Sequence, residues 1–135
     1  MLLLFQNSYK IESRPKGQCL IINNEIFKHL SQRKGSQIDV ENLEMVFSTL
    51  GFSVTIESNL KKAAMEKRLK SFAKETNHTD MIILIILSHG ENGKILCEDY
   101  HQPSNPNLDA FGEVGTLHMT LGFQFLLWKY EIQIF

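Results

Sequence analysis

The sequence predicts an α/β fold built on a doubly wound, mostly parallel sheet with the strand order 2-1-3. Apolar or β-branched runs of strand length recur at residues 18–23, 52–57 and 81–87. Amphipathic segments at residues 39–50 and 60–76 separate these runs, and they are long enough for right-handed crossovers between parallel strands. With 135 residues, the chain has the length of one domain with a buried core.

The first strand is predicted at residues 18–23, QCLIIN, where a short apolar run ends in Asn23-Asn24. Apolar runs of this length that stop at turn-forming residues are typical of buried strands. The polar segment at residues 25–37 is therefore predicted to be a loop at the carboxyl end of this strand.

The segment at residues 39–50 is predicted to be an amphipathic helix. Ser36 followed by Asp39 is typical of a capping box, and Asp39 itself is the alternative N-cap. Gly51 is a favourable residue directly after a helix. The predicted inner face consists of the apolar residues that recur at helical spacing, namely Val40, Leu43, Val46, Phe47 and Leu50.

The sequence FSVTIE at residues 52–57 alternates and is rich in β-branched residues, which predicts the second strand. Asn59 is in position to cap a second helix at residues 60–76, with lysines on its outer face. The predicted inner face of this helix is again apolar and consists of Leu60, Ala63, Ala64, Leu69, Phe72 and Ala73.

The third strand is predicted at residues 81–87, MIILIIL, and it stops abruptly at Ser88, His89 and Gly90. A continuous apolar strand is typical of a parallel sheet that is covered on both faces. No glycine-rich phosphate loop follows the first strand, so a nucleotide site is disfavoured.

The strand order 2-1-3 places the expected ligand crevice between strands 1 and 3, at their carboxyl ends. The loop after strand 1 would bring Arg33 or Lys34 to this point, and strand 3 would bring His89 and Gly90. Imidazole transfers protons near neutral pH, a glycine N–H can approach an oxyanion closely, and a guanidinium fork binds carboxylates. The alternatives are a hydrogen-bonded, inert His89 at a strand end and a solvated surface charge at Arg33.

Composition excludes several classes of function. The net charge is -1, which gives no reason to expect nucleic acid or an anionic membrane as a partner. The five histidines show no metal-ligand spacing, so neither a metal nor another cofactor is expected. The apolar start MLLLF is too short for a signal peptide, and no apolar run is long enough to span a membrane. Cys19 and Cys97 are typical of reduced cytosolic thiols. A cytoplasmic location is therefore expected.

Four segments within residues 9–100 together form a recognisable pattern in their order along the chain. They are KGQCLIINNEIF, QRKGSQIDVENL, FSTLGFSV and ILSHGENGKI. In combination they resemble the large-subunit core of a caspase, most closely the initiator type with death-effector prodomains. The resemblance implies a three-layer caspase-like fold and an aspartate-directed cysteine endopeptidase. It also implies that His89 is the catalytic histidine, that the Gly90 N–H helps to hold the oxyanion, and that Arg33 binds the substrate aspartate.

The sequence departs from the family pattern after the histidine. The family nucleophile is a cysteine in a glutamine-alanine-cysteine motif about 50 residues downstream of the histidine. No such motif occurs here, and the one cysteine after His89 is Cys97, which is typical of small core filling. The chain is therefore expected to be truncated before the catalytic cysteine and to form an incomplete caspase-like fold.

Three units are expected: a disordered leader at residues 1–8, the large-subunit-like core at 9–100 and a divergent tail at 101–135. The first functional hypothesis is a large-subunit fragment of an apoptotic or innate immune protease, which would cut aspartate-containing peptides or proteins only when missing segments complete it. The second is a decoy or scaffold that binds a full caspase or an adaptor. The third is an unrelated α/β binding domain, which a strand order other than 2-1-3 would favour.

Overall fold

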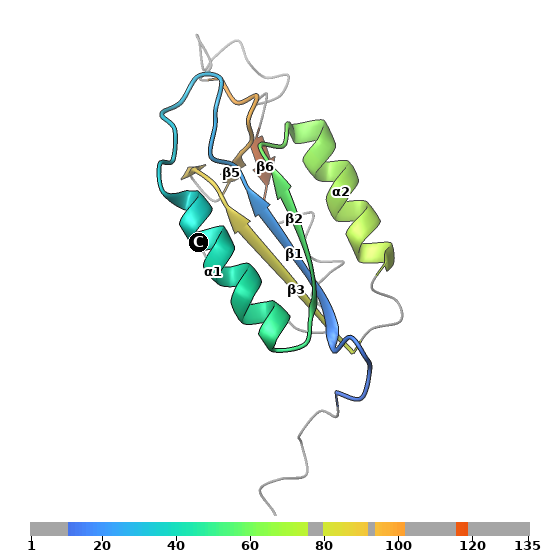
Figure 1. Ribbon diagram of the computed structural model, residues 1–135. Helices are drawn as coiled ribbons and strands as arrows, with labels where there is room; N and C mark the ends of the chain where they lie inside the picture. The colour runs from blue at the N-terminus through green and yellow to red at the C-terminus, as the bar shows by residue number, and fades with distance from the viewer. Residues whose placement is uncertain (1–10, 76–79, 92–93, 102–115, 119–135) are drawn as a thin grey trace, which may run out of the picture.

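The computed structural model describes residues 11–75, 80–91, 94–101 and 116–118 (Figure 1). Three parallel strands alternate with two helices in the order that the sequence predicts. These elements are β1 (Gly17–Asn23), α1 (Ser36–Thr49), β2 (Ser53–Ser58), α2 (Lys62–Glu75) and β3 (Met81–Leu87).

The parallel sheet has the order β2-β1-β3, which confirms the predicted fold class and strand order. β1 pairs with β2 from Gln18 opposite Ser53 onward, and it pairs with β3 along its whole length. β1 is therefore the central strand, and β3 lies at one edge of the sheet that the described residues form. All three strands point the same way, so their carboxyl ends gather at one end of the sheet (Figure 1).

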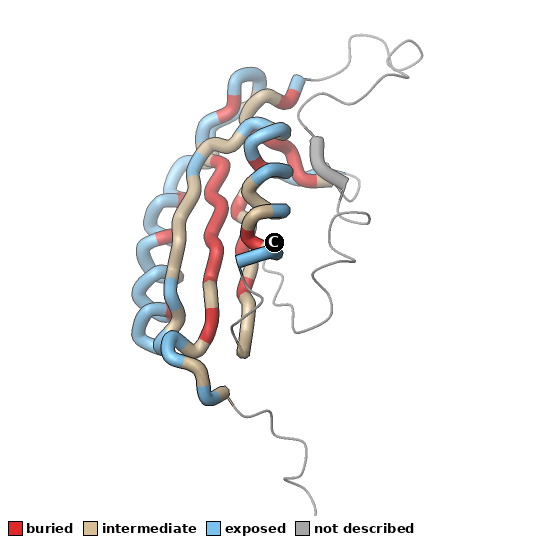
Figure 2. The backbone as a smooth tube through the Cα atoms, turned by 90° about the vertical axis from the view of Figure 1, so that its right-hand side faces the viewer, coloured by how far each residue is buried: buried red, intermediate tan, exposed pale blue. Residues whose placement is uncertain are grey.

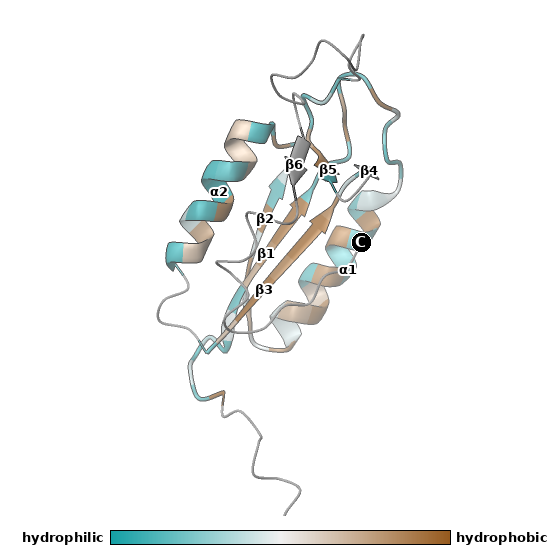
Figure 3. Cartoon of the chain, turned by 180° about the vertical axis from the view of Figure 1, so that it is seen from behind, coloured by the Kyte–Doolittle hydropathy of each residue, from teal (hydrophilic) through white to brown (hydrophobic). Residues whose placement is uncertain are grey.

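The sheet lies between the two helices, α1 on one face and α2 on the other, as the side view in Figure 2 shows. β1 is apolar on both faces because successive side chains of a strand point to opposite sides. Cys19 and Ile21 pack in the core under α1, and Leu20 and Ile22 pack in the core under α2. Figure 3 shows the resulting hydrophobic colouring along β1 and β3.

α1 begins at Ser36, three residues earlier than predicted, and neither predicted side-chain cap forms. The N-cap is Gly35, which has a φ of 88° and makes no side-chain cap hydrogen bond. Ser36 is already inside the first turn, where its buried Oγ has no hydrogen-bond partner. The helix ends at Thr49, one residue before the predicted end, with Leu50 as its C-cap, and Gly51 follows with a φ of 93°, as predicted.

The inner face of α1 is narrower than the sequence predicts. Val40 and Phe47 are buried and Leu43 packs against the same core, but Val46 and Leu50 are each 49% exposed. The reason is geometric, because α1 touches the sheet along one narrow stripe and the described structure covers no second face of this helix.

α2 also differs from its predicted start and inner face. It begins at Lys62, and its backbone N–H there donates to Asp99 Oδ1 at 2.9 Å, so Asp99 caps this end rather than Asn59. Met65 is fully buried and anchors the helix together with Phe72. The two predicted core alanines, at positions 63 and 64, are exposed.

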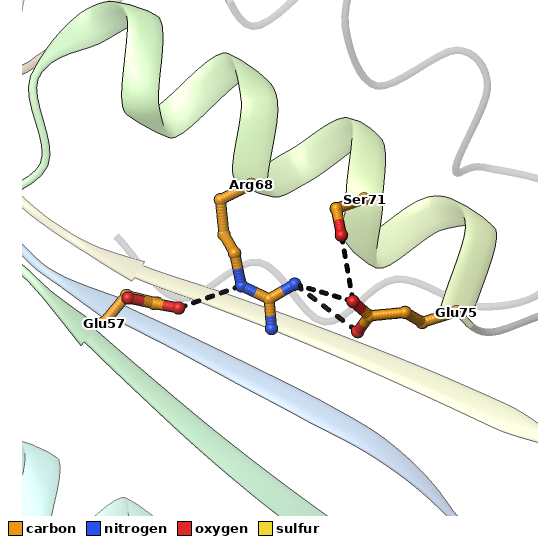
Figure 4. A network of polar contacts seen from close by, with 4 residues as sticks. All are labelled: Glu57, Arg68, Ser71 and Glu75. Atoms are coloured by element: carbon orange, nitrogen blue, oxygen red, sulfur yellow. Dashed lines mark hydrogen bonds and ion pairs between the residues drawn. The ribbon is translucent and has the colours of Figure 1, made fainter.

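A charged network also fastens α2 to the sheet (Figure 4). Arg68 on α2 lies 3.0 Å from a carboxylate oxygen of Glu57 on β2. The same guanidinium lies 3.4 Å from the carboxylate of Glu75, about two turns further along α2. The hydroxyl of Ser71 donates to that carboxylate at 2.9 Å. The Arg68 side chain is only 18% exposed, so it covers apolar surface as well as carrying charge.

A small antiparallel sheet of β4 (Gly90–Glu91), β5 (Lys94–Leu96) and β6 (Thr116–His118) follows β3, in the order β4-β5-β6. The hairpin of β4 and β5 ends directly before Cys97. No helix within the described part of the chain is long and apolar enough to cross a membrane. The predicted leader at residues 1–8 and most of the predicted tail at 101–135 lie outside the described residues.

Candidate functional site

The candidate site lies at the carboxyl ends of β1 and β3, as the strand order predicts. Asn23 and Leu87 are partners in the last register pair of these strands. Directly beyond it, the Asn24 N–H donates to the Leu87 carbonyl at 2.8 Å. The segments that leave the two strands here are the β1–α1 loop, residues 24–35, and Ser88-His89-Gly90.

The β1–α1 loop is fixed at its start by Asn59, the residue after β2. The Asn59 side-chain oxygen accepts the backbone N–H groups of Glu25 at 3.0 Å and Ile26 at 2.9 Å. Asn59 has a φ of 53°, a left-handed conformation that asparagine tolerates better than most residues. Further along the loop, the Lys28 N–H donates to the Glu98 carbonyl at 3.1 Å. The loop is therefore held by neighbouring segments and has a defined path.

Arg33 projects from this loop back toward the end of β1. Its Nη1 donates to Asn23 Oδ1 at 3.3 Å and to the Asn24 carbonyl at 3.1 Å. Both acceptors are uncharged, and Arg33 forms no ion pair with any residue in the described ranges. The guanidinium has five N–H donors, so its Nε and Nη2 edge still has the planar fork that binds a carboxylate. Lys34, the alternative candidate, is exposed, whereas Arg33 is half-buried.

His89 is held by two residues of the same loop. Its Nε2 lies 2.9 Å from the Ser31 carbonyl oxygen, and its ring centre lies 4.8 Å from that of the buried Phe27. A carbonyl oxygen only accepts hydrogen bonds, so Nε2 carries the proton in this arrangement. In the neutral ring, Nδ1 is then the nitrogen that has a lone pair and can accept a proton. Ser31 is two residues from Arg33, so one loop orients both predicted site residues.

The backbone around Gly90 is also defined by hydrogen bonds. The Ser88 hydroxyl donates to the Leu96 carbonyl at 2.6 Å, and the Leu96 N–H donates to the His89 carbonyl at 2.9 Å. Gly90 lies opposite Ile95 in the next register pair. Pairs along an antiparallel ladder alternate between hydrogen-bonded and non-hydrogen-bonded, so the Gly90 N–H points away from β5. Gly90 is exposed and directly follows His89, and a backbone N–H that is not used by the ladder can act as an oxyanion donor.

Both cysteines are packed inside the hydrophobic cores. Burial raises the pKa of the Cys19 thiol to about 12. The pKa of Cys97 is also raised to about 12, first by burial and further by the carboxylate of Asp99. The Cys97 thiol points toward Met65, with its sulfur 3.7 Å from the methionine sulfur. A nucleophilic cysteine needs a lowered pKa and a nearby base, and neither thiol has this environment.

Sequence reasoning brought Arg33 and His89 to the same end of the sheet, and the structure places them there. It missed the residues that hold them, namely Asn23, Phe27, Ser31 and Asn59. Asn23 carried a usable signal, because an uncharged polar residue at the end of a buried strand needs a hydrogen-bond partner. The role of Ser31 had none, because its contact with His89 is made by a backbone carbonyl.

Comparison with known proteins gives consistent matches. A family model described as caspase domain matches residues 16–115. Cell death protein 3 of Caenorhabditis remanei is 42% identical over 91 residues, which cover 67% of this chain and 18% of that protein. Caspase A of Caenorhabditis elegans is 42% identical over 83 residues, with 62% of this chain and 15% of that protein covered.

Caspase-1 of Spodoptera frugiperda is 35% identical over 102 residues, which cover 72% of this chain and 34% of that protein. The chain thus spans less than a fifth of the two nematode proteins and about a third of the insect one. The matched region contains Arg33, His89 and Gly90 together with the residues that hold them.

Proposed function

We propose that this chain, which belongs to the caspase family, forms the large-subunit portion of an aspartate-directed cysteine endopeptidase in apoptosis or innate immune signalling. The observation that carries this proposal is the Arg33 guanidinium. It is oriented by two uncharged acceptors and has no carboxylate partner among the described residues. A half-buried guanidinium in this state favours a ligand that brings its own carboxylate, which is the chemistry of an aspartate side chain.

In this proposal three groups of the core unit at residues 9–100 act on the substrate. The Nε and Nη2 edge of Arg33 binds the aspartate side chain on the amino side of the scissile bond. His89 accepts the proton of the attacking thiol at Nδ1 and later returns it to the leaving amine, while the Ser31 carbonyl holds its ring. The Gly90 N–H donates to the oxygen on which negative charge develops.

The thiol itself comes from outside these 135 residues in our proposal. Cys19 and Cys97 are the two cysteines of the sequence, and both are buried with raised pKa values. A thiol with a pKa of about 12 is almost entirely protonated at pH 7, and the neutral thiol is a poor nucleophile. We therefore infer that these residues alone bind an aspartate side chain but do not turn a substrate over.

The test is hydrolysis of a fluorogenic peptide with a single aspartate by the purified chain, with and without an aspartyl fluoromethyl ketone. We expect no inhibitor-sensitive turnover. Two control variants identify any thiol that reacts, namely Cys19→Ala and Cys97→Ala. Inhibitor-sensitive turnover that disappears in Cys97→Ala would make Cys97 the nucleophile, and turnover that survives both variants would require another nucleophile. Either result would refute the inferred inactivity of these residues alone.

A second candidate function is a cytoplasmic decoy or scaffold that binds a full caspase or an adaptor, and the surface of α1 favours it. Opposite its core face, this helix exposes Ile38 (63%) and Met45 (62%), which are seven residues apart and form an apolar stripe on one side of the helix. We infer that this stripe is the part of the surface that a protein partner would contact. Arg33 lies in the β1–α1 loop and not on α1, so the two candidate functions use different residues.

Pull-down of a full-length caspase tests this second candidate. Met45→Glu places a charge within the stripe, and Ala64→Glu places the same charge at an exposed position on α2, on the other face of the sheet. We expect Met45→Glu to abolish capture and Ala64→Glu to retain it. Equal capture by the two variants would exclude the α1 stripe as the binding surface, and a chain without residues 103–135 shows whether that segment is needed.

A further inference from the structure

Asn23, the last residue of β1, binds the guanidinium of Arg33 through its side-chain oxygen. It is 2% exposed, and its Oδ1 accepts the Arg33 Nη1–H at 3.3 Å. The carbonyl of Asn24 accepts from the same nitrogen at 3.1 Å. Nη1 has two N–H groups, so this one nitrogen serves both acceptors, and the donors on the Nε and Nη2 edge are left for a ligand.

The absence of charge on Asn23 matters as much as its position. An aspartate has nearly the same size and shape, and at this position it would form a buried ion pair with Arg33. Such a pair would neutralise the guanidinium and compete with any incoming carboxylate. An apolar residue would leave the charge in place but would remove one of the two acceptors that fix its orientation. An amide oxygen orients the guanidinium and leaves its charge for the ligand.

We infer that Asn23 is a positioning residue that sets the preference of the site for aspartate, by orienting Arg33 without neutralising it. This inference rests on the proposed function, because it assigns to Arg33 the binding of a substrate carboxylate. Residue 23 is expected to act on the ligand only through Arg33, with no contact of its own.

The experiment compares the binding of N-acetyl-aspartate N-methylamide and N-acetyl-asparagine N-methylamide to the full chain by NMR titration. Asn23→Asp introduces the competing carboxylate, and Asn23→Ala removes the acceptor. The matched control is Ser58→Asp, which adds the same charge at the exposed register partner of Asn23 on β2. The ¹⁵N signals of the Arg33 guanidinium, recorded without ligand, report changes in its hydrogen bonds. An effect of residue 23 on stability alone would leave these signals in place.

We expect wild type to prefer the aspartate amide, Asn23→Asp to lose at least about tenfold in affinity for it, and Asn23→Ala to lose about fivefold. Ser58→Asp should change the affinity less than about threefold, because an exposed carboxylate is hydrated and interacts only weakly with neighbouring charges. The Arg33 signals should shift in both Asn23 variants and stay in place in Ser58→Asp.

The possible failures are distinguishable. If wild type binds both amides alike, the proposed function is wrong and the inference falls with it. If wild type discriminates but both Asn23 variants match its affinity and its preference, only the inference about Asn23 is wrong. If Asn23→Asp fails to fold, Asn23→Ala decides between these outcomes, because it introduces no buried charge.

Discussion

Replacement of Asn59 tests how the β1–α1 loop is held. The Asn59 side-chain oxygen accepts the N–H groups of Glu25 and Ile26 at 3.0 and 2.9 Å, in the first part of the loop that carries Arg33. Its own N–H donates to the Asn23 carbonyl at 3.0 Å, a contact that every non-proline replacement retains. Substitution by alanine therefore removes two acceptor contacts and leaves a Cβ on a residue with a φ of 53°.

The magnitude follows from these two losses. Each hydrogen bond contributes about 1 kcal/mol to the free energy of unfolding, so two contribute about 2 kcal/mol. The left-handed conformation disfavours alanine by about 1 kcal/mol, whereas glycine adopts it freely. Asn59→Ala should thus lower the free energy of unfolding by about 3 kcal/mol and Asn59→Gly by about 2 kcal/mol. Asn59→Asp keeps the acceptor and should stay within about 1 kcal/mol of wild type.

Urea unfolding of the four chains measures these differences, with the m-value checked for constancy. The order wild type, aspartate, glycine, alanine, from most to least stable, is the expected result. Alanine and glycine variants within about 0.5 kcal/mol of wild type would show that Asn59 does not hold the loop. Equal stability of the alanine and glycine variants would show that the left-handed conformation is not retained.

Three further predictions concern the cap of α2, its ion pair and the buried thiols. Asp99→Ala removes the side chain that caps α2 and should lower the free energy of unfolding by about 1 kcal/mol, while Asp99→Asn keeps most of it; urea unfolding distinguishes the two. Arg68→Met removes the ion pair with Glu57 and should lower the free energy of unfolding by no more than about 1 kcal/mol. The loss should be smaller in 1 M NaCl than at low salt, and a loss independent of salt would indicate that packing alone is responsible. Burial raises the pKa of Cys19 and of Cys97 to about 12. The folded chain therefore keeps both thiols protonated between about pH 9 and 12, the range in which the thiols of the unfolded chain ionise. The free energy of unfolding should therefore be unaffected by these groups below about pH 9 and fall as the pH rises from about 9 to 12, by up to about 1.4 kcal/mol per pH unit and cysteine. Replacement of either cysteine by alanine should reduce that slope, and an unchanged slope would contradict the assignment.

The strands and their order could be predicted from the sequence because burial on both faces produces unbroken apolar runs. QCLIIN and MIILIIL have this pattern, and in the structure alternate residues of β1 pack in separate cores. The topology then placed Arg33 and His89 at one end of the sheet without knowledge of any side-chain contact. Periodicity predicted the helices, but it did not distinguish the inner face of α2, where Met65 is buried and Ala63 is exposed.

The contacts that orient the site were not predictable, because they join residues far apart in sequence through local geometry. Asn59 looked like a helix cap, yet its side chain holds the β1–α1 loop, and Asp99 caps α2 from 37 positions away. The acceptor for His89 is the backbone of Ser31, which any residue could provide. Sequence patterns report secondary structure and burial, whereas these pairings depend on how the loops pass one another.

The most direct test of the site is the NMR response of Arg33 and His89 to a free aspartate side chain. The wild-type chain is titrated with N-acetyl-aspartate N-methylamide and, in parallel, with the asparagine analogue. We predict that the aspartate compound shifts the Arg33 guanidinium and His89 imidazole signals together, and that the asparagine compound leaves both in place. Equal shifts with both compounds, or aspartate-dependent shifts confined to the lysines of α2, would contradict a carboxylate site formed by Arg33 beside His89.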